Sequence, residues 1–328
     1  MDLVALFGIG STNFHYTIGT PAGDFVTAVS TEPTQPHRLE DQLLETVAEL
    51  QTTESLDAVA ISAPGLVDPE AGCIRKFDTA DGAFIDRIDL REPIERTFDL
   101  PVYLENDCSA SALGEWYFGR RGEYDCVLHL TFGTGIGGGV VEHGTLLRGD
   151  SGQAGEFGLV SVDPGSDLES DGVPGAWEAF CSGRGIPEYV AHRLEGEDWA
   201  ATDSELVHTA VTTDERLSAP DVFAAAAAGD EFARSCLERL GRYNAVGVGA
   251  LCNAYNPGLV TVGGGVALNN PDWLLEGLEA HLDRFCFVDR PSIEITPLGE
   301  EIGLYGALGT FMDREPGVVH RPVSKTSD

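Results

Sequence analysis

The stretch Leu104-Glu105-Asn106-Asp107 and the later run Thr131-Phe132-Gly133-Thr134-Gly135-Ile136-Gly137-Gly138-Gly139 decide the fold expected for this chain. The first stretch places a carboxylate at the end of an expected strand. The second places a glycine-rich turn with hydroxyl groups between two apolar runs. A carboxylate that accepts a proton, beside backbone amides that hold phosphate, has the groups needed to move a phosphoryl group onto an alcohol. The pair of segments therefore predicts a phosphotransferase.

The size and composition of the chain indicate a folded protein. Its 328 residues suffice for two compact domains or one large one, and 42% of them are apolar. No uncharged apolar run of about 18 residues occurs, and the chain opens on a strand-like segment without a basic leader. We therefore expect a cytoplasmic protein with neither a membrane span nor a signal peptide. The seven widely spaced cysteines contain no C-x-x-C pair, which indicates reduced, mostly buried thiols.

The net charge of −34 comes from 54 acidic side chains against 20 basic ones. The acidic residues are scattered between core-forming segments, so we expect a folded chain rather than a disordered one. A surface this acidic repels nucleic acids and anionic membranes, and neither is an expected partner. Because molar salt shortens the screening length to about 3 Å, the composition predicts adaptation to a salt-rich cytoplasm.

Two rounds of strand, glycine turn, hairpin and helix are expected along the chain. Apolar periodicity and turn residues predict strands at 3–7, 56–61, 102–104, 126–130, 138–142, 146–147, 259–262 and 293–295, a hairpin at 14–20 and 25–30, and helices at 37–50, 90–98, 109–118, 222–228, 232–256, 273–287 and 303–312. This order predicts an α/β protein with two related halves and a cleft between them. A smaller domain at 1–106 is completed by the helix at about 303–314, a larger domain covers 107–302, and 315–328 form a loose tail.

Three glycine turns are candidate phosphate or nucleotide contacts. The turn Gly10-Ser11-Thr12-Asn13 leaves amides and hydroxyls at a strand end, although a plain hairpin corner has the same sequence. The five glycines among residues 133–139 cost chain entropy that a plain turn does not need, which favours phosphate contact. This run lacks the P-loop lysine, which disfavours a Walker-type NTPase. Gly263-Gly264-Gly265 ends an apolar strand. These glycines either let a nucleotide approach the backbone or form a tight turn into a helix.

Three carboxylates are candidate chemical groups. Asp107 is either a general base or the N-cap of the helix that starts at Cys108 or Ser109, and its place beside the glycine turns favours catalysis. Glu156 and Glu178 lie in otherwise apolar surroundings, where an unpaired charge costs several kcal/mol. They suit the hydroxyls of a polyol, and a solvated edge is the alternative for each.

Taken together, these segments resemble the ROK family of sugar kinases and repressors, within the actin-like and hexokinase-like ATPase superfamily. The resemblance runs from about residue 3 to 313 and is most specific at 104–115, 131–139, 148–158 and 257–266. It implies an actin-like (ribonuclease H-like) duplicated ATPase fold of two α/β domains. Repressor members carry an N-terminal helix-turn-helix, and this chain begins at the first strand, so the kinase branch is implied.

The resemblance also implies a role for each candidate residue. Asp107 would take the proton of a sugar hydroxyl that attacks the γ-phosphorus of ATP, with Mg²⁺ bridging the phosphates. The sugar hydroxyls would be held by Asn106, Glu156 and Glu178. The phosphates would be held by Gly10, Ser11, Thr12, Asn13, Thr131, Gly133, Thr134, Gly135 and Gly137, and the adenosine side by Gly263, Gly264 and Gly265. Relatives commonly form dimers, so a homodimer is expected.

The chain departs from the family pattern at three places. Gly8 stands where the family has an aspartate near the metal, which predicts weaker handling of Mg·ATP. Leu159, Glu169, Asp171 and Ala176 occupy the positions of the four ligands of a structural zinc site, so we expect no zinc. Leu159 also replaces a histidine that touches the sugar, which makes the expected sugar pocket less polar.

These expectations define an ATP-dependent hexose kinase, with glucose as the first candidate and a hexose 6-phosphate as product. The alternative is a catalytically weak or inactive sugar- or nucleotide-binding protein of the same family. Fructose, mannose or an N-acetylhexosamine are the other candidate sugars, and a non-sugar alcohol is disfavoured by the pair Glu156 and Glu178.

Overall fold

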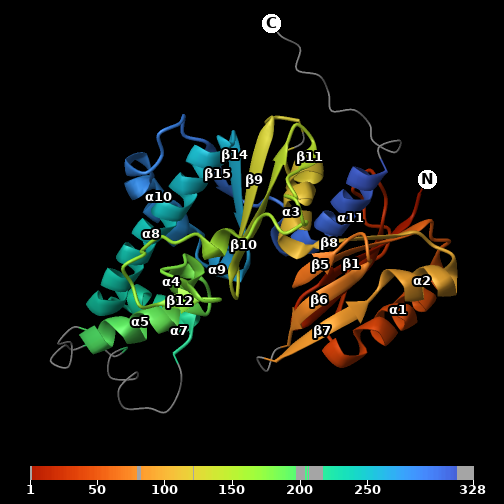
Figure 1. Cartoon of the computed structure of the whole chain (residues 1–328), viewed down its shortest axis with the longest axis horizontal. Helices are drawn as coiled ribbons and strands as arrows, with labels where there is room; N and C mark the ends of the chain where they lie inside the picture. The colour runs from red at the N-terminus through yellow and green to blue at the C-terminus, as the bar shows by residue number, and fades with distance from the viewer. Residues whose placement is uncertain are drawn as a thin grey trace, which may run out of the picture. The chain divides into compact units, whose positions relative to one another are not determined.

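The computed structural model describes residues 2–79, 83–120, 122–196, 204, 206 and 217–315. This part of the chain mixes strands and helices throughout (Figure 1). It falls into two compact units: unit 1 takes the described residues of Met1–His129, Gly139–Gly155 and Thr296–Asp328, and unit 2 takes those of Leu130–Gly138 and Glu156–Ile295. The sequence predicts a different division, into two related halves that separate after residue 106. That division stays a prediction.

Unit 1 is built on a five-stranded sheet of order β3-β2-β1-β4-β8. The strands are β1 (Val4–Ile9), β2 (Asn13–Gly19), β3 (Ser30–Pro33), β4 (Ala58–Ala63) and β8 (Val102–Asn106). β1 pairs antiparallel with β2 and parallel with β4, and β4 pairs parallel with β8. Parallel strands end at the same edge of a sheet. The turn after β1 and the residues after β8 therefore lie at one edge, where Gly8 is in register with Ser62 and Ala63 with Asn106.

Both faces of this sheet are buried, because successive side chains of β1 pack into two different apolar clusters. Phe7 packs in a cluster with residues of α1 (Leu39–Thr53) and α2 (Arg91–Phe98). Leu6 packs in a second cluster with residues of α3 (Asp107–Gly114) and α11 (Ile302–Arg314). Successive side chains of a strand point to opposite faces, so a continuous apolar run is needed where helices cover both faces.

The remaining elements of unit 1 are short. They are η1 (Pro36–Arg38), β5 (Leu66–Asp68), β6 (Cys73–Asp78), β7 (Phe84–Asp89), the π turn η2 (Glu115–Gly119), β11 (Thr145–Leu146) and η5 (Gly299–Glu301). Strands β5, β6 and β7 form a separate three-stranded sheet that the sequence pattern did not predict.

A second five-stranded sheet has the order β11-β10-β9-β14-β15. It contains β9 (Cys126–Phe132), β10 (Ile136–Glu142), β14 (Leu259–Gly263) and β15 (Ser292–Ile295). The other elements of unit 2 are η3 (Phe157–Leu159), β12 (Glu169–Ser170), β13 (Val173–Pro174), α4 (Glu178–Cys181), α5 (Gly185–Gly196), α7 (Ala219–Ala228), α8 (Glu231–Tyr255), α9 (Gly265–Asn269), α10 (Pro271–His281) and η4 (Leu282–Arg284). The division between the units cuts β9 and β10.

Trp177 anchors the core of unit 2. Its ring is fully buried and meets the ring of Phe132 edge-on, with 5.5 Å between centroids. Its Nε1 donates to Oδ1 of Asn244 at 2.9 Å. A Cβ on Gly247 would lie 2.4 Å from the indole, so only glycine leaves room for this ring on α8.

Two predicted elements differ from the structure. The second arm of the first hairpin, expected at 25–30, pairs with β2 at an isolated bridge between Phe25 and Gly19 and becomes a strand at Ser30, because the side chain of Thr27 takes the place of its backbone in the ladder. The Thr27 Oγ1 accepts the N–H of Ile18 at 3.0 Å. The helix expected at 273–287 ends at His281 and continues only as η4. Beyond it, the amide of Asn253 binds the backbone of Phe285 and Phe287, each at 2.7 Å, and holds that segment outside a helix.

Two further expectations concern the ends of the chain and the membrane. The expected loose tail lies outside the described residues except for Glu315, which accepts the hydroxyl hydrogen of Tyr103 at 2.6 Å. Within the described ranges, none of the helices combines the length and the apolar character that a membrane span requires.

Candidate active site

Asn106 and Asp107 lie at the junction of β8 and α3, and Asn106 carries the capping role. Its Oδ1 accepts the N–H groups of Cys108 at 3.0 Å and Ser109 at 3.2 Å, and its Nδ2 donates to the carbonyl of Gly65 at 3.2 Å. The cap considered for Asp107 therefore belongs mainly to its neighbour. Both ends of the Asn106 amide are bound within the chain, and its contact with a sugar stays a prediction.

Asp107 is the first residue of α3 and is half-buried. Its Oδ1 accepts the N–H of Cys108 at 2.9 Å, which fixes the carboxylate against the start of the helix. Burial raises the pKa of Asp107 above its ordinary value, and the N–H of Cys108 opposes that rise. A carboxylate with a raised pKa is a stronger base than an exposed one, as proton abstraction requires.

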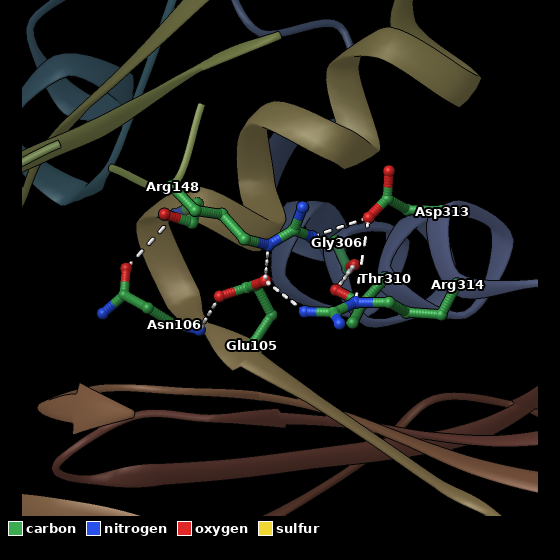
Figure 2. Close-up of polar contacts among 8 residues, drawn as sticks. Glu105, Asn106, Arg148, Gly306, Thr310, Asp313 and Arg314 are labelled. Atoms are coloured by element: carbon green, nitrogen blue, oxygen red, sulfur yellow. Dashed lines mark hydrogen bonds and ion pairs between the residues drawn. The ribbon is translucent and has the colours of Figure 1, made fainter. Parts of the chain in front are cut away.

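Glu105, the residue before this pair, is buried in a cluster of charges that no motif or spacing in the sequence predicts. Its Oε2 accepts Nε of Arg148 at 3.0 Å, and a terminal nitrogen of Arg148 donates to Oδ2 of Asp313 at 2.6 Å. Arg314 lies 3.8 Å from Glu105 and 3.9 Å from Asp313. We call these four residues the Arg148 network. Figure 2 shows the guanidinium of Arg148 between the two carboxylates.

The turn Gly10–Asn13 joins β1 to β2 at the same sheet edge. The N–H of Gly10 donates to the carbonyl of Asn13 at 2.8 Å, and Thr34 donates to the carbonyls of Gly10 and Thr12. It is therefore a hairpin corner, as the simpler interpretation holds. Thr12 and Asn13 are exposed, so the corner also presents polar side chains to a ligand.

Gly8 is buried on β1 against α11. A Cβ built at Gly8 would lie 3.4 Å from the carbonyl carbon of Gly303. This is an ordinary van der Waals distance, so the space around a Cβ at position 8 does not by itself require glycine.

Glu178, at the start of α4, organises the polar centre of unit 2. Its Oε2 accepts the N–H of Ile136 at 2.9 Å, and its Oε1 accepts the hydroxyl hydrogen of Ser170 at 2.6 Å. A Cβ would lie 2.7 Å from Oε2 at Gly135 and 2.6 Å from it at Gly158. The solvated edge considered for Glu178 is thus replaced by a bound carboxylate, and its contact with a sugar stays a prediction.

The glycine run 133–139 is therefore explained in part by packing. Gly135 makes room for Glu178, and a Cβ on Gly139 would lie 2.9 Å from the side chain of Ala112. Gly133 has no such neighbour, since only Thr131 comes within 4 Å of its Cβ position. Thr134 is exposed, and its carbonyl accepts the N–H of Arg184 at 3.3 Å. Gly133 donates its N–H to the carbonyl of Gly135 at 3.0 Å and its carbonyl accepts the N–H of Gly183 at 2.8 Å, so both of its backbone groups are bound. Phosphate contact along this run stays a prediction.

The turn Gly263–Gly265 lies against this run. Gly264 has φ +85°, and its Cβ would lie 2.5 Å from the carbonyl oxygen of Phe132, so the tight turn alone requires glycine there. Gly265 is exposed and has open space around its Cβ position. Unit 2 thus brings together both glycine turns and Glu178, whereas Glu156 is exposed just before η3.

Of the four positions that the resemblance assigns to zinc ligands, Glu169 and Asp171 lie in the β12–β13 hairpin, and Leu159 and Ala176 lie outside it. Glu169 and Asp171 are exposed, Leu159 is half-buried and Ala176 is fully buried. The hydroxyl of Ser170 ties this hairpin to Glu178. Among the described residues, no group of three or more His, Cys, Asp or Glu is placed to hold a metal ion. The absence of zinc stays a prediction.

Comparison with known proteins adds the following. The model of the ROK family matches residues 6–312. The glucokinase of Thermotoga maritima is 30% identical over 326 residues, covering 97% of this chain and 100% of that protein. The solved ROK hexokinase of Thermus thermophilus has a TM-score of 0.79 at 29% identity, covering 96% of this chain and 100% of that one. The ROK glucokinase of Streptomyces griseus, solved with glucose and AMPPNP, has a TM-score of 0.72 at 28% identity, covering 93% and 98%.

Proposed function

This chain belongs to the ROK family, and on that basis we propose that it is an ATP-dependent hexose kinase with Asp107 as its general base. The observation that carries the proposal is the place of Asp107. Its carboxylate is fixed by Cys108 at the edge where the parallel strands of unit 1 end. Ligands of open α/β sheets bind outside this end of the strands.

The reaction needs one proton transfer and one in-line displacement. As the sugar oxygen attacks the γ-phosphorus, the bond from phosphorus to the β-phosphate oxygen breaks and ADP leaves. Asp107 receives the hydroxyl proton, so the oxygen that now joins the sugar to phosphorus carries no proton in the product. Such transfer depends mainly on positioning and on stabilisation of charge.

We propose that the phosphates contact the turn Gly10–Asn13 and the run 131–137, in which the side chain of Thr134 is exposed. The adenosine side is assigned to Gly263–Gly265. Mg²⁺, bound with ATP, would neutralise the phosphate charge, and few protein ligands are needed because the ion keeps phosphate and water oxygens. Glucose is the first candidate, because the similar proteins of Thermotoga maritima and Streptomyces griseus are named glucokinases. Asn106, Glu156 and Glu178 are the proposed sugar contacts.

The remaining proposals follow the sequence. We propose a cytoplasmic homodimer without zinc, adapted to a salt-rich cytoplasm and without nucleic acid or membrane as partner. The net charge of −34 supports both the adaptation to salt and the absence of nucleic acid or membrane as a partner. Gly8 in place of an aspartate supports weaker use of Mg·ATP than in relatives that keep the carboxylate.

The test is a sugar panel. Purified protein in about 2 M KCl, where surface repulsion is screened, is given ATP and Mg²⁺ with glucose, fructose, mannose, N-acetylglucosamine or N-acetylmannosamine. ADP formation is measured for each. Turnover of at least one hexose supports the proposal. Stabilisation by a sugar in a thermal melt, without ADP from any of them, would instead show a binding protein.

Asp107→Asn tests the base itself. We expect kcat to fall by about 10²–10⁴-fold, the usual contribution of general base catalysis, with the thermal unfolding temperature retained. Asp41→Asn, an exposed aspartate on α1, is the matched control and should keep full activity. Full activity in Asp107→Asn would show that another group takes the proton.

A further inference from the structure

The buried carboxylate of Glu105 directly precedes the two residues assigned to the sugar and the proton. Along β8, Tyr103 and Glu105 share the face of the sheet that α11 covers, where the ring of Tyr103 meets Phe311 edge-on at 5.2 Å. Glu105 is only 2% exposed. A carboxylate in such surroundings requires a bound partner, because its desolvation costs several kcal/mol.

Arg148 is the principal partner of Glu105. Its Nε lies 3.0 Å from Glu105 and its terminal nitrogen 2.6 Å from Asp313, so the planar guanidinium spans two carboxylates from different elements. Arg314 approaches the same carboxylates only at 3.8 and 3.9 Å, beyond hydrogen-bond distance. The orientation of Glu105 therefore depends on the fork of Arg148 rather than on charge alone.

Arg148 also holds its own loop. Its carbonyl accepts the N–H of Ala154 at 3.1 Å, which closes the segment leading to Glu156. Glu105 in turn accepts the N–H of Asn106 at 3.2 Å with its other oxygen. Arg148 thus connects two segments: its carbonyl binds the loop before an expected sugar contact, and its side chain binds the strand end that carries Asn106 and Asp107.

Stability alone does not explain these charges. Replacing a buried ion pair by apolar side chains of similar volume is often neutral or stabilising, so such a pair is weak evidence for stability. The network instead fixes orientation: the guanidinium of Arg148 binds one carboxylate on β8 and one on α11, and its backbone belongs to the loop after Leu147.

We propose that Arg148 is a positioning residue for catalysis: by binding Glu105 and Asp313 it holds the β8–α3 junction, and with it Asp107, in the geometry for proton transfer. This inference rests on the proposed function for its consequence in catalysis. The structural part of the inference, that Arg148 orders the β8–α3 junction, applies to the protein without substrate and can be tested without catalysis.

The test compares Arg148→Lys with Arg87→Lys. Lysine keeps the charge but cannot span two carboxylates. Arg87, on β7, binds Asp89 through the same two kinds of nitrogen at 2.9 and 2.5 Å, but it is exposed and belongs to the separate sheet of β5, β6 and β7. For Arg148→Lys we expect kcat to fall about tenfold or more at saturating sugar and ATP, as misplacement of a reacting group by a fraction of an ångström does. Arg87→Lys should match wild type.

A merely structural role would lower the folded fraction without changing kcat per folded molecule. Folded fraction is therefore measured by thermal melt in the same buffer. Glu105→Gln should lower kcat to the same extent, and the double variant should be no worse than either single one, because both remove one interaction. If Arg148→Lys does not fold, Glu105→Gln carries the comparison, since it keeps the side-chain shape and removes only the charge.

Hydrogen exchange gives a readout that needs no turnover. In Arg148→Lys without substrate, the amides of residues 106–109 should exchange faster than in wild type, with no such change in Arg87→Lys. Unchanged exchange there, wild-type kcat in folded Arg148→Lys, or additive losses in the double variant would each overturn the proposal. Inactivity of the wild type on every sugar would refute the proposed function instead, and the exchange comparison would still decide the structural part of the inference.

Discussion

Asp107 combines two opposed influences on one carboxylate. Burial raises its pKa, and the N–H of Cys108 opposes that rise. A raised pKa in the folded state means that the folded protein holds the proton more tightly than the unfolded chain. This carboxyl therefore contributes stability that is fully present below its unfolded pKa and is lost as the pH rises through its folded pKa. At neutral pH the ionised side chain is a cost to folding that serves its role as a base.

We expect two pH effects from this shift. The acid limb of kcat/KM should fall at a pH clearly above 3.8, the ordinary value for an aspartate, because the base must be deprotonated. Asp107→Asn should be at least as stable as wild type near neutral pH, and the difference should shrink in acid. Urea unfolding and a pH–rate profile measure the two effects. A limb at or below 3.8, or an Asn variant less stable than wild type at neutral pH, would contradict the assigned shift.

For single residues, the sequence predicted which residue types lie at the end of β8, but not which of them caps the helix. An acid and an amide at a strand end were expected, but a helix cap and its neighbour differ by one residue, and both Asn and Asp can cap. The bond from Arg148 to Glu105 joins residues 43 apart. No local pattern specifies which distant charge a buried carboxylate will meet, so that contact required the structure.

Helices α3 and α11 pack at backbone distance through small residues. A Cβ on Gly306 would lie 2.7 Å from the carbonyl carbon of Ala110, and one on Gly309 would lie 2.8 Å from that of Leu113. Figure 1 shows the two helices side by side within unit 1. Since α3 begins at Asp107, the same contact that packs the helices also sets the position of the base.

Comparing Gly306→Ala with Gly303→Ala, both on α11, distinguishes the effect of overpacking on stability from the effect of helix propensity. The first should lower the free energy of unfolding by about 1–3 kcal/mol through overpacking, and should lower kcat because α3 must shift. At Gly303 the nearest atom to an added Cβ lies 3.7 Å away, so alanine should be neutral or stabilising by up to about 1 kcal/mol. Urea unfolding and steady-state kinetics measure both. Equal effects at the two positions would refute the packing argument.

Most long elements were predicted because their apolar period is clear, as in α1 and α8. The sheet of β5, β6 and β7 was missed because charged residues such as Arg75 and Arg87 occupy its exposed positions. Short strands of this kind are specified by their partners rather than by their own composition.

For the whole molecule, the dominant fact is a charge of −34. Most of the arginine ion pairs of the described residues lie at the surface, as that of Arg38 with Glu45 does. Exposed pairs of this kind contribute about 0–1 kcal/mol each. They leave most of the acidic repulsion uncompensated, so screening by salt should matter more to stability than these pairs do.

The unfolding temperature should therefore rise by several degrees as KCl is raised from about 0.1 to 2 M. Thermal melts at constant pH measure the effect. Potassium acetate at equal ionic strength should act similarly, and glycerol at equal osmolality should act less, because it does not screen charge. An unfolding temperature independent of KCl would rule out salt adaptation.

Helix α11 completes a core begun by the first strand: Leu304, Ala307 and Leu308 share a cluster with Val4 and Leu6. On the ribosome, the part of unit 1 that precedes His129 must therefore wait for α11 to be made. Synthesis of the residues between His129 and Thr296 takes roughly ten to thirty seconds at about 5–20 residues per second. During that time the nascent chain exposes the apolar face that α11 will cover, and we expect it to bind chaperones that recognise such faces.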